Sequence, residues 1–183
     1  NRNDIISEAP SLKKALFLSM ETPRPIEVSY DTPQTLGMDR VASAIGAHVL
    51  FPNHSALIID LGTCITYDLL ADQVFQGGMI APGIGLRLRA MHEFTANLPL
   101  LDFYEPKKLI GKSTSESMVS GAFHGILGEI EHHISQLMLK IPDIKVIMTG
   151  GNVHLFESKI KSDIFVAPEL VLIGLNGVLK YNA

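Results

Sequence analysis

Hydrophobic and polar positions follow one another along this chain in blocks whose period changes between that of a strand and that of a helix. Residues 26–30 have the pattern of a short strand, and residues 39–49 carry apolar side chains at helical spacing. Three apolar runs follow at residues 56–61, 65–70 and 74–81, with only a few turn residues between them. Sequential short strands with tight connections predict an antiparallel meander, which we expect at the edge of a sheet.

The second half of the chain continues this alternation. Residues 84–94 have helical periodicity, and Ser113 and Glu116 match the S-x-x-E capping box at the start of a long amphipathic helix. Its apolar stripe comprises Met118, Ala122, Phe123, Ile126, Ile130, Ile134 and Leu137. The remaining predicted elements are a strand at 144–148, a short helix after 151, a strand at 164–166 and a helix at 169–179. Strands alternating with helices predict an α/β protein.

Composition narrows the classes of function. The 183 residues are 46% hydrophobic and 19% charged, with a formal net charge of −4, which is typical of a packed globular protein. The basic residues are scattered, so we expect no nucleic-acid interface and no binding to an anionic membrane. No apolar stretch reaches the roughly 20 residues that span a bilayer. The single cysteine, Cys64, excludes an internal disulfide and fits a reducing, cytoplasmic location.

The strongest local motif is the Asp60-x-Gly62-Thr63 turn between two predicted strands. Its glycine permits a sharp hairpin whose backbone N–H groups can approach an anion, and Thr63 adds a hydroxyl donor. Asp60 ends an apolar strand and needs a cation or hydrogen-bond donors if it is buried. A phosphate and cation site explains all three residues, although an ordinary hairpin with a polar turn has the same pattern.

Two further glycine segments have less specific patterns. Gly77 and Gly78 lie near the end of the third strand of the meander, and Gly83 precedes a helix whose N-terminus would attract phosphate. Tight strand packing followed by a turn explains these residues equally well. Gly150 and Gly151 follow a strand, where a nucleotide base or ribose could lie against the backbone, or where the chain simply turns into a helix. Neither segment identifies a function by itself.

Asp39 and Arg40 follow Gly37 at the start of a predicted helix. An acidic residue in the first helical turn is commonly explained by the helix dipole alone. A carboxylate here can also take the proton from an attacking hydroxyl, and a guanidinium can hold a substrate carboxylate through two parallel hydrogen bonds. A small-molecule kinase requires both groups, and the isolated motif leaves the two interpretations open.

In chain order, these segments resemble the family of type III pantothenate kinases over nearly all 183 residues. The matching series is Tyr30-x-x-Pro33-x-x-Leu36-Gly37-x-Asp39-Arg40, Asp60-x-Gly62-Thr63, Gly77-Gly78-x-Ile80-x-Pro82-Gly83, Thr95-Ala96-x-Leu98-Pro99, Gly111-x-Ser113-Thr114 with Met118 and Gly121, and Thr149-Gly150-Gly151. Each motif alone is weakly specific, whereas the ordered series is highly specific.

The resemblance implies an α/β protein with the actin-like ATPase fold, in which two ribonuclease H-like halves have mixed sheets flanked by helices and ATP lies between them. Residues 1–50 would be the remainder of the N-terminal half, whose first strands are missing, and residues 51–183 would be the C-terminal half. The family begins with a D-x-G-N-T phosphate loop. Nothing like it precedes Tyr30, and Asn1 is neither an initiation site nor the start of a signal peptide. A chain without that loop is expected to be inactive and poorly stable alone.

The same resemblance implies ATP-dependent phosphorylation of pantothenate to 4′-phosphopantothenate, the first step of coenzyme A biosynthesis. Asp39 would be the general base, and Asp60 would bind a monovalent cation, potassium or ammonium, besides the Mg²⁺ that accompanies ATP. The other implied contacts are those of Tyr30, Gly37, Met38, Arg40 and Thr114 with pantothenate and those of Gly62, Thr63, Gly150 and Gly151 with ATP. Family members are homodimers in which the long-helix region completes the pantothenate pocket.

Two alternatives remain open. A non-catalytic pantothenate- or ATP-binding regulatory relative would need no base, so the joint presence of the residues Asp39, Arg40, Asp60 and Thr63 favours the kinase. A small-molecule kinase or phosphatase of the same superfamily with another acceptor is disfavoured by the series from Tyr30 to Arg40.

Overall fold

The computed structural model describes residues 15–183, so the chain start at Asn1 lies outside the described residues. The described strands form one six-stranded sheet in the order β1-β4-β3-β2-β5-β6. They are β1 (Glu27–Val28), β2 (Ala56–Leu61), β3 (Cys64–Ala71), β4 (Val74–Pro82), β5 (Lys145–Thr149) and β6 (Phe165–Val166). The pairs β2–β3 and β3–β4 are antiparallel, whereas β1–β4, β2–β5 and β5–β6 are parallel. The predicted α/β class with a mixed sheet is confirmed.

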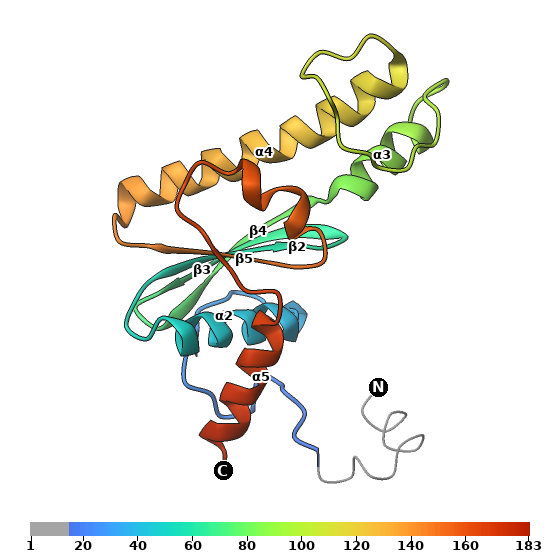
Figure 1. The fold of residues 1–183 in the computed structure, drawn as a ribbon. Helices are drawn as coiled ribbons and strands as arrows, with labels where there is room; N and C mark the ends of the chain where they lie inside the picture. The colour runs from blue at the N-terminus through green and yellow to red at the C-terminus, as the bar shows by residue number, and fades with distance from the viewer. Residues whose placement is uncertain (1–14) are drawn as a thin grey trace.

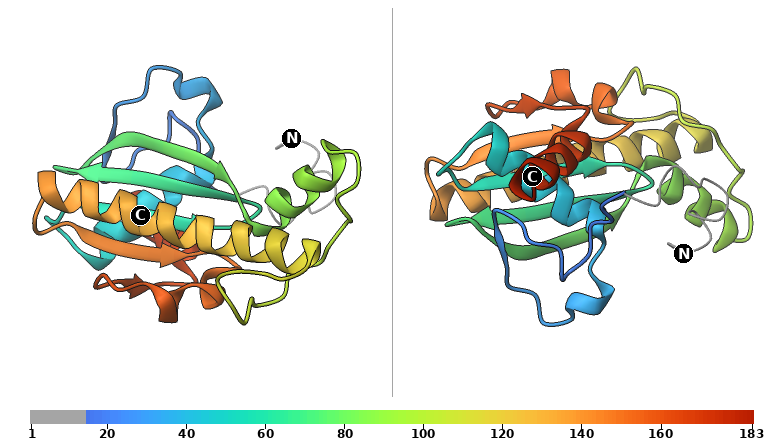
Figure 2. Two further views of the ribbon diagram at one scale, coloured as in Figure 1. Left: turned by 90° about the horizontal axis from the view of Figure 1, so that it is seen from above. Right: turned by 90° about the horizontal axis from the view of Figure 1, so that it is seen from below.

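Helices cover both faces of this sheet (Figure 1). The helices α2 (Met38–Leu50) and α5 (Leu170–Tyr181) lie on one face, and α4 (Thr114–Lys140) crosses the other. The helix α3 (Ile84–Glu93) continues from the end of β4 and lies beside the first half of α4. Figure 2 views the molecule first from the α4 side and then from the side of α2 and α5. Three short 3₁₀ turns complete the described elements at Pro33–Thr35, Val153–Leu155 and Glu157–Lys159.

The meander formed by β2, β3 and β4 was correctly predicted, but its expected position at the edge of the sheet was wrong. Strand β5 pairs with β2 and strand β1 pairs with β4, so the meander occupies the centre. Hairpin signals are local, whereas both outer strands come from distant parts of the chain. A signal for the central position does exist in β2, because nearly every one of its side chains is buried and a strand covered on both faces has this pattern.

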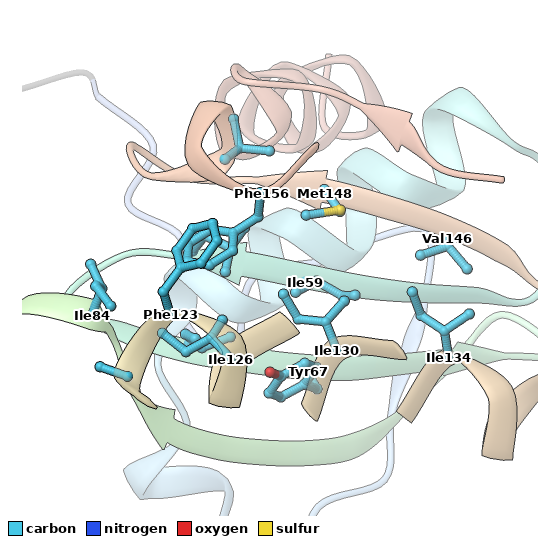
Figure 3. Close-up of a cluster of buried hydrophobic side chains, with 14 of the residues drawn as sticks. Ile59, Tyr67, Ile84, Phe123, Ile126, Ile130, Ile134, Val146, Met148 and Phe156 are labelled. Atoms are coloured by element: carbon cyan, nitrogen blue, oxygen red, sulfur yellow. The ribbon is translucent and has the colours of Figure 1, made fainter. Parts of the chain in front are cut away.

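Two hydrophobic layers hold the helices on the sheet. Along β2, Leu57, Ile59 and Leu61 point into the layer beneath α4, whereas Ile58 points into the layer beneath α2 and α5. Figure 3 shows part of the first layer, which includes Ile59, Tyr67, Phe123, Ile126, Ile130, Ile134 and Phe156. Burial of one such side chain stabilises the fold by roughly 1.5–3 kcal/mol. Because side chains alternate along a strand, Asp60 faces the same side as Ile58, toward α2.

The predicted cap of α4 is present in altered form. The N–H of Glu116 donates to Oγ of Ser113 at 3.2 Å, which is the first half of a capping box. The carboxylate of Glu116 does not return to the N–H of Ser113 but accepts from the N–H of Lys112 at 2.7 Å. The predicted apolar stripe is buried from Met118 to Ile134, and Leu137 is half-buried at its end.

Glycines let α2 and α5 approach each other closely. A Cβ at Gly174 of α5 would overlap the carbonyl group of Ala42, and one at Gly46 of α2 would overlap the carbonyl group of Leu170. The two backbones are therefore in direct contact, with no side chain between them at these positions. This contact fixes α2, and with it the Gly37–Arg40 segment, relative to the sheet.

Candidate active site

The first turn of α2 brings a carboxylate to the sheet face that β2 and β3 present. Asp39 is exposed, and its Oδ1 accepts the backbone N–H of Arg40 at 2.8 Å. Gly37 is the N-cap residue of α2, and a Cβ at this position would overlap the same carboxylate oxygen. Met38 is half-buried and packs against the hydrophobic layer beneath α2. A glycine at this turn therefore leaves Asp39 both fixed and accessible to a substrate.

A second carboxylate, that of Asp60, lies at the end of β2 on the same face. Asp60 pairs in register with Thr66 of β3 and with Thr149 of β5. Burial raises the pKa of Asp60, and the nearby charges of Asp39 and Asp68 raise it further. Among the residues that the structure describes, no donor or cation pairs with this carboxylate. A half-buried carboxylate in a negative surrounding attracts a cation.

A third carboxylate, Asp68 of β3, is paired with Arg40. Nε of Arg40 donates to Oδ1 of Asp68 at 3.0 Å and to Oδ2 at 3.2 Å, and Nη2 also donates to Oδ1. Burial raises the pKa of Asp68, and hydrogen bonds from Arg40 and Thr66 partly oppose that rise. The guanidinium carbon of Arg40 lies 5.9 Å from the ring centre of Tyr30 and 5.6 Å from that of Phe75. The pair thus links the start of α2 to β3, and the two aromatic rings lie over the guanidinium of Arg40.

This pairing bears on the contacts predicted for pantothenate. Two of the three guanidinium nitrogens of Arg40 already donate to Asp68, and Arg40 also interacts with the Tyr30 hydroxyl, so few of its donors are left for a substrate. Tyr30 is half-buried beside Arg40, and its ring lies against Gly77, whose φ of 94° favours glycine. Asp68 was not assigned a role from the sequence. The sequence did contain a signal for Asp68. It is an acidic residue among the apolar residues of a buried strand, and such a residue needs a partner.

Two glycine turns meet beside Asp60. The Gly62–Thr63 turn connects β2 and β3, and Gly150 follows β5 with φ of 95°. A Cβ at Gly150 would overlap Oδ1 of Asp60 and the backbone of Leu61, so the chain requires glycine at this approach. Gly151 is exposed, and open space surrounds the position of its missing Cβ. The structure therefore brings the two predicted nucleotide-binding segments together at one end of the sheet.

A pocket of about 400 Å³ opens at this end, between the Gly62–Thr63 turn and the start of α3. It is lined by Gly62, Thr63, Ile84, Gly85, Leu86, Arg89, Phe103, Asn152 and Leu155. Asn152 fixes the turn, because its N–H donates to the carbonyl of Leu61 at 3.0 Å and its Nδ2 donates to that of Gly62 at 3.3 Å. The N-terminus of α3 and the guanidinium of Arg89 give the pocket a positive character, which suits phosphate.

Sequence reasoning missed Arg89 and Asn152. Arg89 comes from a segment without a recognised motif, and Asn152 directly follows the Gly150-Gly151 motif but was not singled out. Both reach the pocket because α3 and the turn after β5 fold onto the Gly62–Thr63 turn. Gly83, which was considered as a helix start near phosphate, is the N-cap residue of α3, and its N–H donates to the carbonyl of Thr63 at 2.9 Å.

Thr114 does not join the other predicted residues within the chain. It is the first residue of α4, is exposed, and belongs to the helix that crosses the sheet face opposite to α2 (Figure 1). Leu109 and Ile110, just before it, are 65% and 75% exposed.

No group of three or more His, Cys, Asp and Glu side chains within residues 15–183 has a geometry that would hold a metal ion. No helix in this part of the chain has both the length and the apolar character required to cross a membrane.

Comparison with known proteins gives consistent matches. The family model of type III pantothenate kinase matches residues 5–136. The type III pantothenate kinase of Cytophaga hutchinsonii is 45% identical over 183 residues, which are all of this chain and 77% of that protein. The type III pantothenate kinase of Porphyromonas gingivalis is 44% identical over 172 residues, which are 92% of this chain and 70% of that protein.

A solved structure shares the fold. A conserved Campylobacter jejuni protein assigned to the Baf family of transcriptional activators superposes with a TM-score of 0.62 over 98% of this chain and 79% of that one. The two sequences are 21% identical, so this likeness concerns the fold alone.

Proposed function

Because this chain belongs to the family of type III pantothenate kinases, we propose that it transfers the γ-phosphoryl group of ATP to the primary hydroxyl of pantothenate. The product is 4′-phosphopantothenate, and the reaction is the first step of coenzyme A biosynthesis in the cytoplasm. One observation about the site carries the proposal. Asp39, Asp60 and the two glycine turns at Gly62 and Gly150 converge on one end of one sheet.

Asp39 is proposed as the general base. Its carboxylate accepts the hydroxyl proton while the hydroxyl oxygen forms a bond to the γ-phosphorus. The bond from that phosphorus to the β–γ bridging oxygen breaks, and ADP leaves. The exposure of Asp39 and its fixed position in the first turn of α2 support this role, because phosphoryl transfer depends chiefly on placement and charge stabilisation.

The pocket beside the Gly62–Thr63 turn is proposed to hold the ATP phosphates. Its positive character comes from the start of α3 and from Arg89, and Thr63 adds a hydroxyl. Gly150 and Gly151 would leave room for the nucleoside beside β5.

Asp60 is the residue proposed to hold a monovalent cation, potassium or ammonium. Its half-buried carboxylate has no partner within the described residues, which fits a cation ligand. Such a cation, together with the Mg²⁺ bound to ATP, neutralises phosphate charge when it is bound. No triad of acidic side chains is required, since carbonyl and phosphate oxygens are also suitable ligands.

Tyr30, Gly37, Met38 and Arg40 are proposed to contact pantothenate next to Asp39. Thr114 would serve the site of a second copy of the chain, which is supported by its position on the helix opposite to α2. The exposed Leu109 and Ile110 would then be covered in a homodimer.

We further propose that residues 51–183 form the C-terminal ribonuclease H-like half, to which residues 1–50 add the remainder of the N-terminal half.

The test is pantothenate-dependent release of ADP by the full-length protein, measured with Mg²⁺ in potassium and then in sodium. We expect turnover only when pantothenate is present, and faster turnover in potassium. ADP release with other hydroxyl acceptors but not with pantothenate would indicate another small-molecule kinase. Binding of both ligands without any ADP would instead indicate a non-catalytic relative.

A further inference from the structure

One arginine side chain joins α3, α4 and the sheet on the face opposite to Asp39. Nη2 of Arg87 donates to Oε2 of Glu129 on α4 at 2.6 Å, and Nε of Arg87 donates to the carbonyl oxygen of Pro82 at 2.7 Å. The other carboxylate oxygen of Glu129 accepts the hydroxyl of Tyr67, a buried residue of β3, at 2.9 Å. Figure 3 places Tyr67 beside Ile126 and Ile130 of α4. Each carboxylate oxygen of Glu129 therefore already accepts a hydrogen bond.

The carbonyl that Arg87 holds belongs to the peptide unit at which β4 becomes α3. Pro82 is the last residue of β4, and Gly83 is the N-cap residue of α3. The other side of this peptide is held as well, because the N–H of Gly83 donates to the carbonyl of Thr63 at 2.9 Å. A Cβ at Gly83 would approach the carbonyl oxygens of Gly62 and Thr63 too closely, so the two segments are in backbone contact.

This peptide unit lies next to both walls of the candidate phosphate pocket. One wall of the pocket is the Gly62–Thr63 turn, and the other is the first turn of α3 with Ile84 and Gly85. The Pro82–Gly83 peptide connects the two walls. Neither Arg87 nor Glu129 lines the pocket, so their effect on a bound nucleotide is indirect, and the hydrogen bond from Arg87 to the Pro82 carbonyl provides a link to the pocket walls.

We propose that Arg87 and Glu129 are positioning residues for ATP: Glu129 orients Arg87, and Arg87 holds the start of α3 at the correct distance from the Gly62–Thr63 turn. This inference rests on the proposed function, because it takes the pocket to be the phosphate site. The Arg87 and Glu129 side chains retain 20% and 24% exposure, and a pair that is partly solvated contributes little to stability. The two short hydrogen bonds of Arg87 therefore serve mainly to fix the position of the start of α3.

The experiment compares the KM for ATP with the KM for pantothenate in the full-length protein, together with ATP affinity by calorimetry. Arg87→Met removes both hydrogen bonds at similar length, and Glu129→Gln keeps the shape but removes the charge. We expect the KM and the Kd for ATP to rise about tenfold in Arg87→Met, because the Pro82 carbonyl loses the charge-assisted hydrogen bond that holds it. The KM for pantothenate should change less than about twofold.

Lys159→Met is the matched control. Lys159 also forms a partly exposed ion pair, with Glu105 at 2.6 Å, and lies over the ring of Phe123 at 6.0 Å. Its loss should lower stability by a similar small amount and leave both KM values unchanged. Arg87→Lys is the conservative variant, whose ammonium can reach Glu129 or Pro82 but not both in the same geometry, so it should recover part of the ATP affinity.

The outcomes separate the inference from the function on which it rests. Wild-type protein that binds no ATP would overturn the proposed function, and the inference would fall with it. Wild-type protein that binds ATP while Arg87→Met and Glu129→Gln keep its KM for ATP would overturn the inference alone. Equal rises in both KM values would also overturn it, because they indicate a general loss of structure. If Arg87→Met does not fold, Glu129→Gln and Arg87→Lys decide the question.

Discussion

An arginine–carboxylate pair links each face of the sheet to a helix in the described part of the chain, and the two pairs differ in their surroundings. On the α2 face, the side chains of Arg40 and Asp68 are only 9% and 1% exposed, and two aromatic rings lie over the guanidinium. On the α4 face, Arg87 and Glu129 are partly open to water. The same kind of ion pair therefore lies in a surrounding of low dielectric constant on the α2 face and in one closer to that of water on the α4 face.

This difference separates two tasks. A buried pair cannot lose one partner without leaving a charge that water does not reach, so Arg40 and Asp68 should govern stability as well as the position of Asp39. A pair in contact with water tolerates such a loss, so Arg87 and Glu129 can govern the position of α3 with little effect on stability. Replacement of one residue on each face tests this distinction.

The largest effect is expected for Asp68→Ala. This substitution leaves the guanidinium of Arg40 buried and unpaired, which should lower the free energy of unfolding by about 3–5 kcal/mol. Arg87→Met on the other face leaves the hydrogen bond from Tyr67 to Glu129 in place and should lower it by about 1 kcal/mol, the value of a partly exposed pair. Urea denaturation of both variants provides the measurement. Equal losses would show that the two environments do not differ as described.

A glycine substitution on each face sharpens the same comparison. Gly174→Ala places a methyl group into the carbonyl of Ala42 between α2 and α5, so we expect a loss of about 1–3 kcal/mol. Gly128 lies on the exposed side of α4, and the methyl group that Gly128→Ala adds there meets no atom within 4 Å. This substitution should raise stability by roughly 0.5–1 kcal/mol, because alanine favours helices. Thermal unfolding of the two variants would contradict this interpretation if Gly174→Ala were neutral.

A smaller gain in stability is expected for Asp60→Asn. The folded state raises the pKa of Asp60 above its ordinary value, so the ionised carboxylate costs stability at pH 7, and this cost disappears as the pH falls through the raised pKa. The variant should therefore be more stable than wild type at neutral pH and equal to it in acid. Urea midpoints measured across this pH range provide the check.

Potassium supplies the control for that prediction. A cation bound at Asp60 should stabilise the wild type in proportion to the logarithm of its concentration above the Kd, and it should not stabilise Asp60→Asn. Identical responses of the two proteins to potassium and sodium would argue against a specific cation site at this residue.

Local patterns predicted most of the fold. Periodicity located the strands of the meander and the long helix, because each element buries one face and its apolar residues repeat accordingly. The place of the meander in the sheet was predicted wrongly, since β1 and β5 pair with it from distant parts of the chain. The apolar run of β2 indicates burial on both faces, but a short sequence window does not identify the partner strands.

For the site, the structure shows where the residues lie, and their roles stay predictions. The glycine turns and the carboxylates of Asp39 and Asp60 were located from motifs, and the structure brings them to one end of the sheet. The partner of Arg40 was not found, because Asp68 is 28 residues away. Arg87 and Glu129 are 42 residues apart, and nothing in either segment alone indicates that they meet. Such pairings depend on tertiary structure.

The most direct test of the central claim is the rate at which Asp39→Asn forms 4′-phosphopantothenate, followed by mass spectrometry in the full-length protein. A base that only accepts a proton should leave ATP and pantothenate affinities within about twofold while the rate falls by about 10²–10⁴. That result would establish Asp39 as the catalytic base of this kinase. Turnover within a few-fold of wild type would contradict the account and reduce Asp39 to a residue that begins a helix.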